Sequence, residues 1–334
     1  NTKTSNFNKH LNIDEQRPLI VVAQVYGAKQ VITGDFNSDG RLDMAAASYG
    51  SYPSTGEHDK IAWYNNTDGL GNFSENVVST NVSGAFSVVA GDFNGDGHLD
   101  LASASVVDNK IAWYKNVDGL GTFGPQIVVT TNTSQANFVV VGDINNDGAL
   151  DLVSASKFDN KIAWYNNTDG KGAFGRQIVV TTDALSARGV AVGDFDRDGF
   201  LDIASASAHD DTIAWYKNID GQGTFGAKIT VTTATKHAYS VIVGDFDGDG
   251  WLDLASASAY DDKIAWYKNT NGTFGNQIVI SRSANYVRRI TACDLNNDGR
   301  LDLASGSIGD DKIAWYQNLG PCCSVPGEGT ENKV

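Results

Sequence analysis

The amino-acid sequence predicts an all-β, six-bladed β-propeller with four antiparallel strands in each blade. The first observation is a motif, Asp-x-(Asp/Asn)-x-Asp-Gly-x-Leu-Asp, whose six copies begin 57, 51, 51, 51 and 49 residues apart. The second is that each copy lies between an apolar stretch and a run of small alternating residues, which is typical of two β-strands. The third is that each period contains four short strand-like segments separated by turn residues, which is typical of a propeller blade.

The strands of one repeat can be assigned in order. A first strand is expected over residues 189–194, and the acidic motif follows it. The second strand is expected over 201–207, the third over 212–216 and the fourth over 228–233. The other repeats follow the same plan.

The sixth repeat ends after its third strand, at residues 313–316. Residues 7–13 have the pattern of the fourth strands, so we predict that this N-terminal strand closes the last blade and covers an open sheet edge. A single propeller domain is therefore predicted over residues 1–320, and a flexible tail over 321–334.

Each acidic motif has the oxygen spacing of a calcium loop. Such loops use side-chain oxygens at positions 1, 3, 5 and 9, a backbone carbonyl at position 7, and Gly at position 6 for the turn. An EF-hand would need Glu at position 12, but Ala46 or a serine stands there, and strands flank the loop. One copy alone could be an acidic turn. Six complete copies predict up to six Ca²⁺, one per blade.

The predicted metal-binding residues occupy positions 1, 3, 5, 7 and 9 of each loop, with position 7 acting through its carbonyl. In the first three repeats they are Asp35, Asn37, Asp39, Arg41, Asp43, Asp92, Asn94, Asp96, His98, Asp100, Asp143, Asn145, Asp147, Ala149 and Asp151. In the last three they are Asp194, Asp196, Asp198, Phe200, Asp202, Asp245, Asp247, Asp249, Trp251, Asp253, Asp294, Asn296, Asp298, Arg300 and Asp302. The loops hold half of the 40 acidic residues, whose mutual repulsion bound cations would relieve.

Three repeated motifs resemble those of a known family: the acidic loop, Ile-Ala-Trp-Tyr-x-Asn, and Asp-Gly-x-Gly-x-Phe-Gly. Together they resemble the FG-GAP/VCBS repeat over residues 7–320, a family that includes the integrin α propeller and a fungal propeller lectin. The resemblance implies calcium loops on one face of a propeller, and family members act in adhesion, in glycan binding and as appendages of enzymes. Integrin propellers have seven blades, whereas this chain has six repeats, so their ligand geometry is not transferred.

A candidate ligand site is predicted where the repeats differ. The loops from a fourth strand to the next first strand lie opposite the calcium loops, because the strands alternate in direction. Six residues before each motif stand Lys29, Phe86, Asn137, Arg188, Tyr239 and Arg288. Variable aromatic and cationic positions on a repeated scaffold suit a binding surface, although surface loops also vary without function.

The repeats also place aromatic and basic residues at equivalent third-strand positions. The tryptophans are Trp63, Trp113, Trp164, Trp215, Trp266 and Trp315. They could stack on sugar rings, but packing between blades favours a core role. The lysines that precede these strands are expected to be solvated turn residues: Lys60, Lys110, Lys161, Lys263 and Lys312.

Composition bounds the classes of partner and compartment. The formal net charge of -15 argues against nucleic-acid binding. No apolar run approaches the ~18 residues of a membrane span, so no membrane insertion is expected. Millimolar extracellular calcium favours a secreted protein, and sequons are compatible with a glycoprotein: Asn65, Asn72, Asn81, Asn132, Asn166 and Asn271. Cys293 either pairs with one of the tail residues Cys322 and Cys323, or all three thiols are free.

The preferred function is a secreted calcium-binding propeller that acts as a lectin or cell-adhesion module for a glycan or glycoprotein. The alternative is a structural repeat domain of a larger, disulfide-linked or otherwise assembled, extracellular structure. A polysaccharide-degrading enzyme is less favoured because no familiar catalytic motif is present. For that function, acid–base groups would have to come from His209, His237, Tyr239 and Arg188, which are expected to gather on one face.

Overall fold

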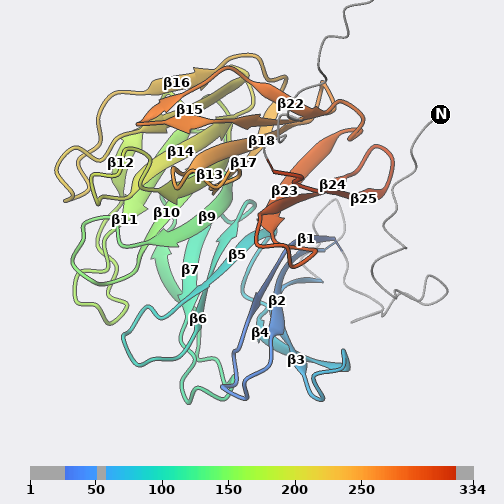
Figure 1. Cartoon of the computed structure of the whole chain (residues 1–334). Coiled ribbons are helices and arrows are strands. Elements are labelled where there is room, and N and C mark those ends of the chain that lie inside the picture. Colours follow the sequence, from blue (N-terminus) through green and yellow to red (C-terminus); the bar gives the residue numbers. More distant parts are fainter. Residues whose placement is uncertain (1–26, 51–57, 321–334) are drawn as a thin grey trace, which may run out of the picture.

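A computed structural model describes residues 27–50 and 58–320. The regular secondary structure of these residues consists of β-strands alone. Figure 1 shows the strands grouped into sheets that follow one another around a common axis as the chain proceeds from blue to red. Within each sheet the strands pair antiparallel in chain order. The predicted all-β propeller with six blades is confirmed.

The strands have the following bounds. Blade one contains β1 (Ala28–Gly34), β2 (Asp43–Tyr49), β3 (Asp59–Asn66) and β4 (Phe73–Ser79). Blade two contains β5 (Ala85–Gly91), β6 (Asp100–Ser105), β7 (Lys110–Tyr114) and β8 (Ile127–Thr130). Blade three contains β9 (Ala136–Gly142), β10 (Asp151–Ser156), β11 (Lys161–Tyr165) and β12 (Ile178–Thr181).

The second half of the chain repeats this plan. Blade four contains β13 (Ala187–Gly193), β14 (Asp202–Ser207), β15 (Thr212–Tyr216) and β16 (Ile229–Thr232). Blade five contains β17 (Ala238–Gly244), β18 (Asp253–Ser258), β19 (Lys263–Tyr267) and β22 (Ile278–Ser281), with a small hairpin of β20 (Asn269–Thr270) and β21 (Thr273–Phe274). Blade six contains β23 (Val287–Cys293), β24 (Asp302–Ser307) and β25 (Lys312–Tyr316).

Blade six has three strands within the described part of the chain. Its predicted fourth strand, residues 7–13, lies outside the described residues, so that part of the prediction is untested. The start of β1 faces blade six across a groove of about 580 Å³. Val31 and Ile313 line this groove and are 54% and 91% exposed, which makes the junction between blades six and one more open than the others.

The hydrophobic core lies between neighbouring blades. The first strands of successive blades contact one another, which places them nearest the axis. Ile61 and Trp63 of blade one pack with Val88, Leu101 and Tyr114 of blade two. Equivalent clusters join the next blades in turn. Each blade is therefore stabilised by the burial of its faces against its neighbours.

The residue that ends each first strand reflects this close packing. A Cβ atom on Gly142 would lie 2.9 Å from Cδ1 of Leu201 in the next blade, so any larger residue there would displace the leucine side chain. In β23 the same position is Cys293, which is exposed and forms no disulfide with a described residue. Its predicted partners, Cys322 and Cys323, lie outside the described residues. In blade one, the residue equivalent to Leu201 is Leu42. Leu42 is 64% exposed, which leaves room for the side chain of Cys293.

Candidate calcium loops and the axial face

Each predicted calcium loop connects the first two strands of its blade. In blade four, β13 ends at Gly193 and β14 begins at Asp202, so the acidic motif forms the turn between them. The glycine at position 6 has a φ between +81° and +88° in all six loops. This left-handed conformation is strained for residues with a Cβ, which explains the glycine in every copy.

The carboxylate at position 1 closes the turn. In loop four, Asp194 accepts hydrogen bonds from the backbone N–H of Asp198 at 3.2 Å and of Gly199 at 3.0 Å. Asp198 accepts in turn from the N–H of Phe200 at 3.0 Å. The same three bonds recur in the other five loops. The loop therefore has one geometry in every blade.

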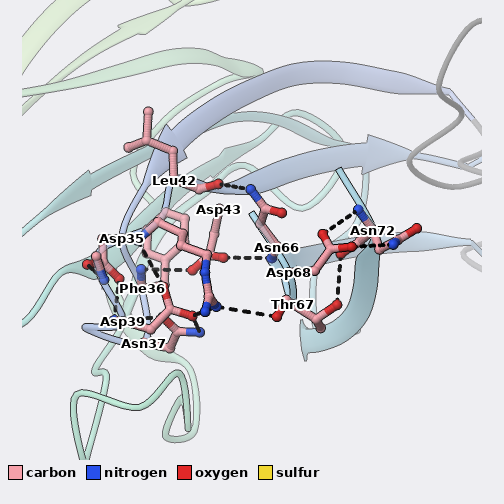
Figure 2. Close-up of polar contacts among 12 residues, drawn as sticks. Asp35, Phe36, Asn37, Asp39, Leu42, Asp43, Asn66, Thr67, Asp68 and Asn72 are labelled. Carbon is pink, nitrogen blue, oxygen red and sulfur yellow. Dashed lines mark hydrogen bonds and ion pairs between the residues drawn. The ribbon is translucent and has the colours of Figure 1, made fainter. Parts of the chain in front are cut away.

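The aspartate at position 9 is fully buried in all six loops. In loop one, Asp43 accepts the N–H of Phe36 at 3.1 Å on one oxygen and the N–H of Asn66 at 2.8 Å on the other, as Figure 2 shows. The other five aspartates accept the same pair of bonds. This residue therefore ties the loop to the end of the third strand.

Burial disfavours the charged form of several of these aspartates. Desolvation raises the pKa of Asp100 and of Asp151 to about 6 and that of Asp202 to about 7, although two backbone N–H donors act in the opposite direction. Carboxylates at loop positions 1, 3 and 5 add to the rise. A bound divalent cation would stabilise the carboxylate form.

Loops four and five gather several carboxylate oxygens at one place. Ligand atoms of Asp194, Asp196 and Asp202 lie within 4.8 Å of one another, and the three equivalent aspartates of loop five do the same. In the other four loops position 3 is asparagine, whose amide oxygen can also bind a hard cation. The donor set fits Ca²⁺, which prefers oxygen ligands.

A lysine side chain in these two blades shows that the loop carboxylates attract a cation. Nζ of Lys217 contacts Asp196 and lies 3.0 Å from Asp198. Lys268 takes the same place in blade five. Hydrogen bonds to these carboxylates raise the pKa of both lysines. The acidic positions 3 and 5 thus favour a positive charge between them.

In blades two to six, an asparagine that follows the third strand links the blade to the loop of the preceding blade. Nδ2 of Asn116 donates to the carbonyl of Phe36 in loop one at 2.8 Å and to that of Leu99 in its own blade at 3.2 Å. Four further asparagines make the same bond to the preceding loop: Asn167, Asn218, Asn269 and Asn318. The sequence motif contained this asparagine, but its role between blades was not predicted.

On the opposite face, each candidate ligand residue is the extra residue of a β-bulge at the start of a first strand. The pairing of β13 with β14 passes from Ala187 to Gly189 and skips Arg188. The same shift occurs in all six blades and skips Lys29, Phe86, Asn137, Tyr239 and Arg288 in the others. A bulge releases a side chain from the alternation of its strand and re-aims it. All six side chains line one cavity of about 380 Å³.

Four basic side chains converge on this axial face. Lys29, Arg188 and Arg288 line the cavity, and Arg289 lines the adjoining groove beside Lys29. Within residues 27–50 and 58–320, none of the four forms an ion pair with a carboxylate. Burial lowers the pKa of Lys29 and of Arg188, and lowers that of Arg289 to about 10. The fold therefore holds several buried or half-buried positive charges close together.

Aromatic rings separate these cations. Tyr239 lies between the guanidinium groups of Arg188 and Arg288, whose central carbons are 4.8 and 5.0 Å from the centre of its ring. Arg288 also lies 4.9 Å over the ring of Tyr286. Such cation–π contacts partly offset the repulsion between the charges.

The rings continue outward as an aromatic cluster of His237, Tyr239, Tyr260 and Tyr286. His237 stacks on Tyr260 with 4.2 Å between ring centres and 12° between ring planes, and Tyr260 is 5.6 Å from Tyr286. His209 lies 6.4 Å from His237. The structure thus brings together the four residues predicted to gather here, and adds Tyr260 and Tyr286, which the sequence analysis missed.

The FG-GAP-like repeat family matches the chain five times, over residues 35–103, 100–154, 143–205, 194–256 and 245–305. The chain belongs to the FG-GAP-like repeat family. This confirms the resemblance seen in the repeated motifs. No curated protein sequence matches the chain.

Several solved structures share the propeller fold of this FG-GAP protein at low sequence identity. The V. cholerae biofilm matrix protein Bap1 has a TM-score of 0.50 at 17% identity, covering 80% of this chain and 42% of Bap1. Apo ctPRC2 in an autoinhibited state has a TM-score of 0.56 at 12% identity, and the match covers 84% of this chain and 65% of that chain. The rhamnogalacturonan lyase YesW has a TM-score of 0.51 at 14% identity, and the match covers 84% of this chain and 55% of YesW. The chain spans less than half the length of Bap1, and these likenesses show the fold alone.

The repeated tryptophans of this FG-GAP propeller are core residues in blades one to four, where they are at most 4% exposed. Trp215, for example, packs edge-to-face on Phe195 of its own loop, with ring centres 5.8 Å apart. This confirms the core interpretation over sugar stacking for these four residues. Among the described residues, no helix could cross a lipid bilayer.

The prediction that the lysines before the third strands are solvated is wrong for two of them. Lys110 is 9% exposed and Lys263 is 3% exposed. Nζ of Lys110 lies 2.9 Å from the carboxylate of Asp108 and donates to the carbonyl of Asn81 at 2.9 Å. An ion pair within the turn thus allows the ammonium group to be buried.

Proposed function

We propose that this FG-GAP propeller is a secreted, calcium-stabilised lectin or adhesion module that recognises a glycan or glycoprotein at its axial face. The observation that carries the proposal is the convergence of the six bulge residues on one cavity. They differ in chemistry from blade to blade, whereas the loops of the other face repeat a single geometry. Variable side chains on a rigid scaffold are the usual arrangement of a binding surface.

Calcium would be held by the side chains at loop positions 1, 3, 5 and 9 and by the carbonyl at position 7. When bound, it supplies the positive charge that the clustered carboxylates lack. The role proposed for it is structural, because the loops follow the ends of the first strands and the cavity lies at their beginnings.

Secretion is supported by the calcium chemistry. Six loops with three or four acidic side chains each suit the millimolar calcium found outside cells. The similar structure of Bap1, which is named as a biofilm matrix protein, agrees with an extracellular setting.

A glycan array tests the proposal. The protein is applied in millimolar calcium, beside the variants Lys29→Ala and Arg288→Ala, which remove cations from the cavity. Arg282→Ala is the matched control, because Arg282 is exposed and does not line the cavity. Binding of a restricted set of glycans is expected, with a loss of about tenfold in both cavity variants and none in the control. Absence of any bound glycan would contradict the proposal.

A further inference from the structure

We propose that the axial cavity and the aromatic cluster together bind an anionic saccharide. Its acidic group would lie against Arg188 and Arg288, and its sugar ring against the exposed face of Tyr260. This inference rests on the proposed function and narrows the class of glycan.

The charge balance of the protein makes these cations unusual. The chain carries 40 acidic and 25 basic residues, yet the four cations of the axial face have no carboxylate partner among the described residues. Carboxylate partners are abundant elsewhere, as in the pairs of Lys217 and Lys228. Cations gathered without partners at a cavity in an acidic protein favour an anionic ligand.

Unused hydrogen-bond donors point the same way. Nε of Arg188, Nε of Arg288 and both terminal nitrogens of Arg289 are buried and have no hydrogen-bond partner among the described residues. A terminal nitrogen of Arg188 donates to Oδ1 of Asn137 at 3.3 Å. Tyr239 satisfies the charge of its arginine neighbours in part, but the face of a ring offers no lone pair to an N–H donor. A carboxylate or sulfate accepts two such bonds at once, which matches the fork of a guanidinium group.

The aromatic cluster indicates that the anion is part of a sugar. Tyr260 is 64% exposed and contacts both His237 and Tyr286. Tyr and His present flat apolar faces with a polar edge, which suits the C–H face of a pyranose. The cluster joins the cavity through Tyr239, so a saccharide longer than one unit can contact both.

Two rings of the cluster stand at a turn that has one backbone conformation in every blade. The residue two places before each bulge residue has a positive φ: Gly27, Gly84, Gln135, Ser186, His237 and Tyr286. The turn therefore places His237 and Tyr286 at equivalent positions of blades five and six, where both contact Tyr260.

The geometry of the whole molecule is compatible with a negative polymer. The acidic loops follow the ends of the first strands, whereas the cations stand at the beginnings of those strands. An anionic chain can therefore approach the axial face without first meeting the loop carboxylates, and bound calcium would reduce their repulsion further.

A series of matched polymers tests the inference. Binding of the whole protein is measured by biolayer interferometry in millimolar calcium to dextran, carboxymethyl-dextran, dextran sulfate and poly-L-glutamate. The two charged dextrans distinguish a carboxylate from a sulfate as the anion, dextran removes the charge, and poly-L-glutamate removes the sugar. At least one charged dextran is expected to bind more than about tenfold more tightly than dextran, and binding should weaken as sodium chloride is added.

Variants assign the two halves of the site. Arg188→Gln and Arg288→Gln should each weaken binding of the charged dextran by about tenfold, and Tyr260→Ala should weaken it several-fold. Arg282→Gln, a charge change at an exposed arginine outside the cavity, should leave it unchanged. Because Tyr260 is largely exposed, its variant should fold even if an arginine variant does not.

The possible failures separate this inference from the proposed function. If neutral glycans of the array bind and neither charged dextran binds, the ligand is not anionic. The protein would then still be a lectin, as proposed above. Poly-L-glutamate that binds as tightly as the charged dextrans would overturn the saccharide. Failure of every dextran and every array glycan to bind would overturn both proposals.

Discussion

The six repeats are alike on one face of this propeller and differ from one another on the other face. On the loop face, six copies of one motif make the same hydrogen bonds, and the aspartate at position 9 is fully buried in each. On the axial face, the six equivalent residues are of five kinds (only arginine occurs twice) and gather around one cavity. Acidic side chains cluster on the first face. The second face carries four cations that have no carboxylate partner in the part of the chain that the structure describes.

The difference follows from how each position is connected. A loop aspartate accepts bonds from two separate segments of its blade, so a change there leaves several donors unsatisfied. A bulge residue such as Arg188 stands outside the strand pairing, and its replacement leaves the ladder intact. The loop face is therefore expected to govern stability, and the axial face to govern recognition.

Removal of calcium from the loop face should cause the largest loss of stability. If free calcium is about tenfold above each Kd, six independent sites contribute about 8 kcal/mol to the free energy of unfolding. Excess EGTA should then lower the Tm by roughly 10–20 °C, because the carboxylates lose their counter-charge. Thermal melting followed by circular dichroism measures this, and added calcium should restore the midpoint while magnesium should not. An unchanged Tm would show that the loops are stable without the ion.

Replacement of one buried loop aspartate should have the next largest effect. Asp253→Ala leaves the N–H groups of Phe246 and Asn269 without an acceptor, at a cost of about 3 kcal/mol in urea unfolding. Asp220→Ala is the matched control, because Asp220 also accepts two backbone N–H groups but is exposed. The control should be distinctly less destabilising, and equal losses would mean that burial is not what makes the loop residue important.

The contact between blades can be tested at a single asparagine. Nδ2 of Asn269 donates to the carbonyl of Phe195 in the preceding blade at 2.7 Å and to that of Leu252 at 2.9 Å. Asn269→Ala should therefore lower the free energy of unfolding by about 2 kcal/mol. Asn66 donates at 3.1 Å to Leu42 of its own blade and is less buried, so Asn66→Ala should have a smaller effect. If both variants melt alike, the bond to the preceding blade adds little.

The smallest expected change in stability is an increase, at a residue of the axial face. Arg188 is half-buried beside other cations, and both burial and the charge of Arg288 lower its pKa. Arg188→Gln should consequently leave the ligand-free protein unchanged or stabilise it by up to about 1 kcal/mol, although it impairs binding. Chemical denaturation without ligand measures this. A clear loss of stability would place Arg188 among the structural residues and remove the contrast between the faces.

Much of the fold could be predicted because the same signals occur six times. Alternating small residues and turn glycines located the strands, and the constant distance to the acidic motif located Arg188 and its equivalents. That distance did not reveal the bulge, because one extra residue in a strand has no distinct sequence signal. It is the bulge that explains why these side chains share a cavity.

Other features depend on contacts between blades, which a repeat period does not encode. Tyr260 and Tyr286 come from different parts of blades five and six, and the packing of these two blades brings their rings to 5.6 Å. Arg289 reaches the groove beside Lys29 in the same way, through the arrangement of separate blades. The asparagine after the third strand did carry a signal, since it recurs in every repeat. Its partner, however, is a backbone carbonyl about 70–80 residues earlier, at a place that no side-chain pattern marks.

The asparagine bond also gives the ring a direction. In loop one, the residue at position 2, Phe36, donates its N–H to Asp43 of its own blade and offers its carbonyl to Asn116 of the next. A loop that loses its shape thus withdraws an acceptor from the blade that follows it. Each loop therefore contributes to the attachment of the next blade as well as to the shape of its own.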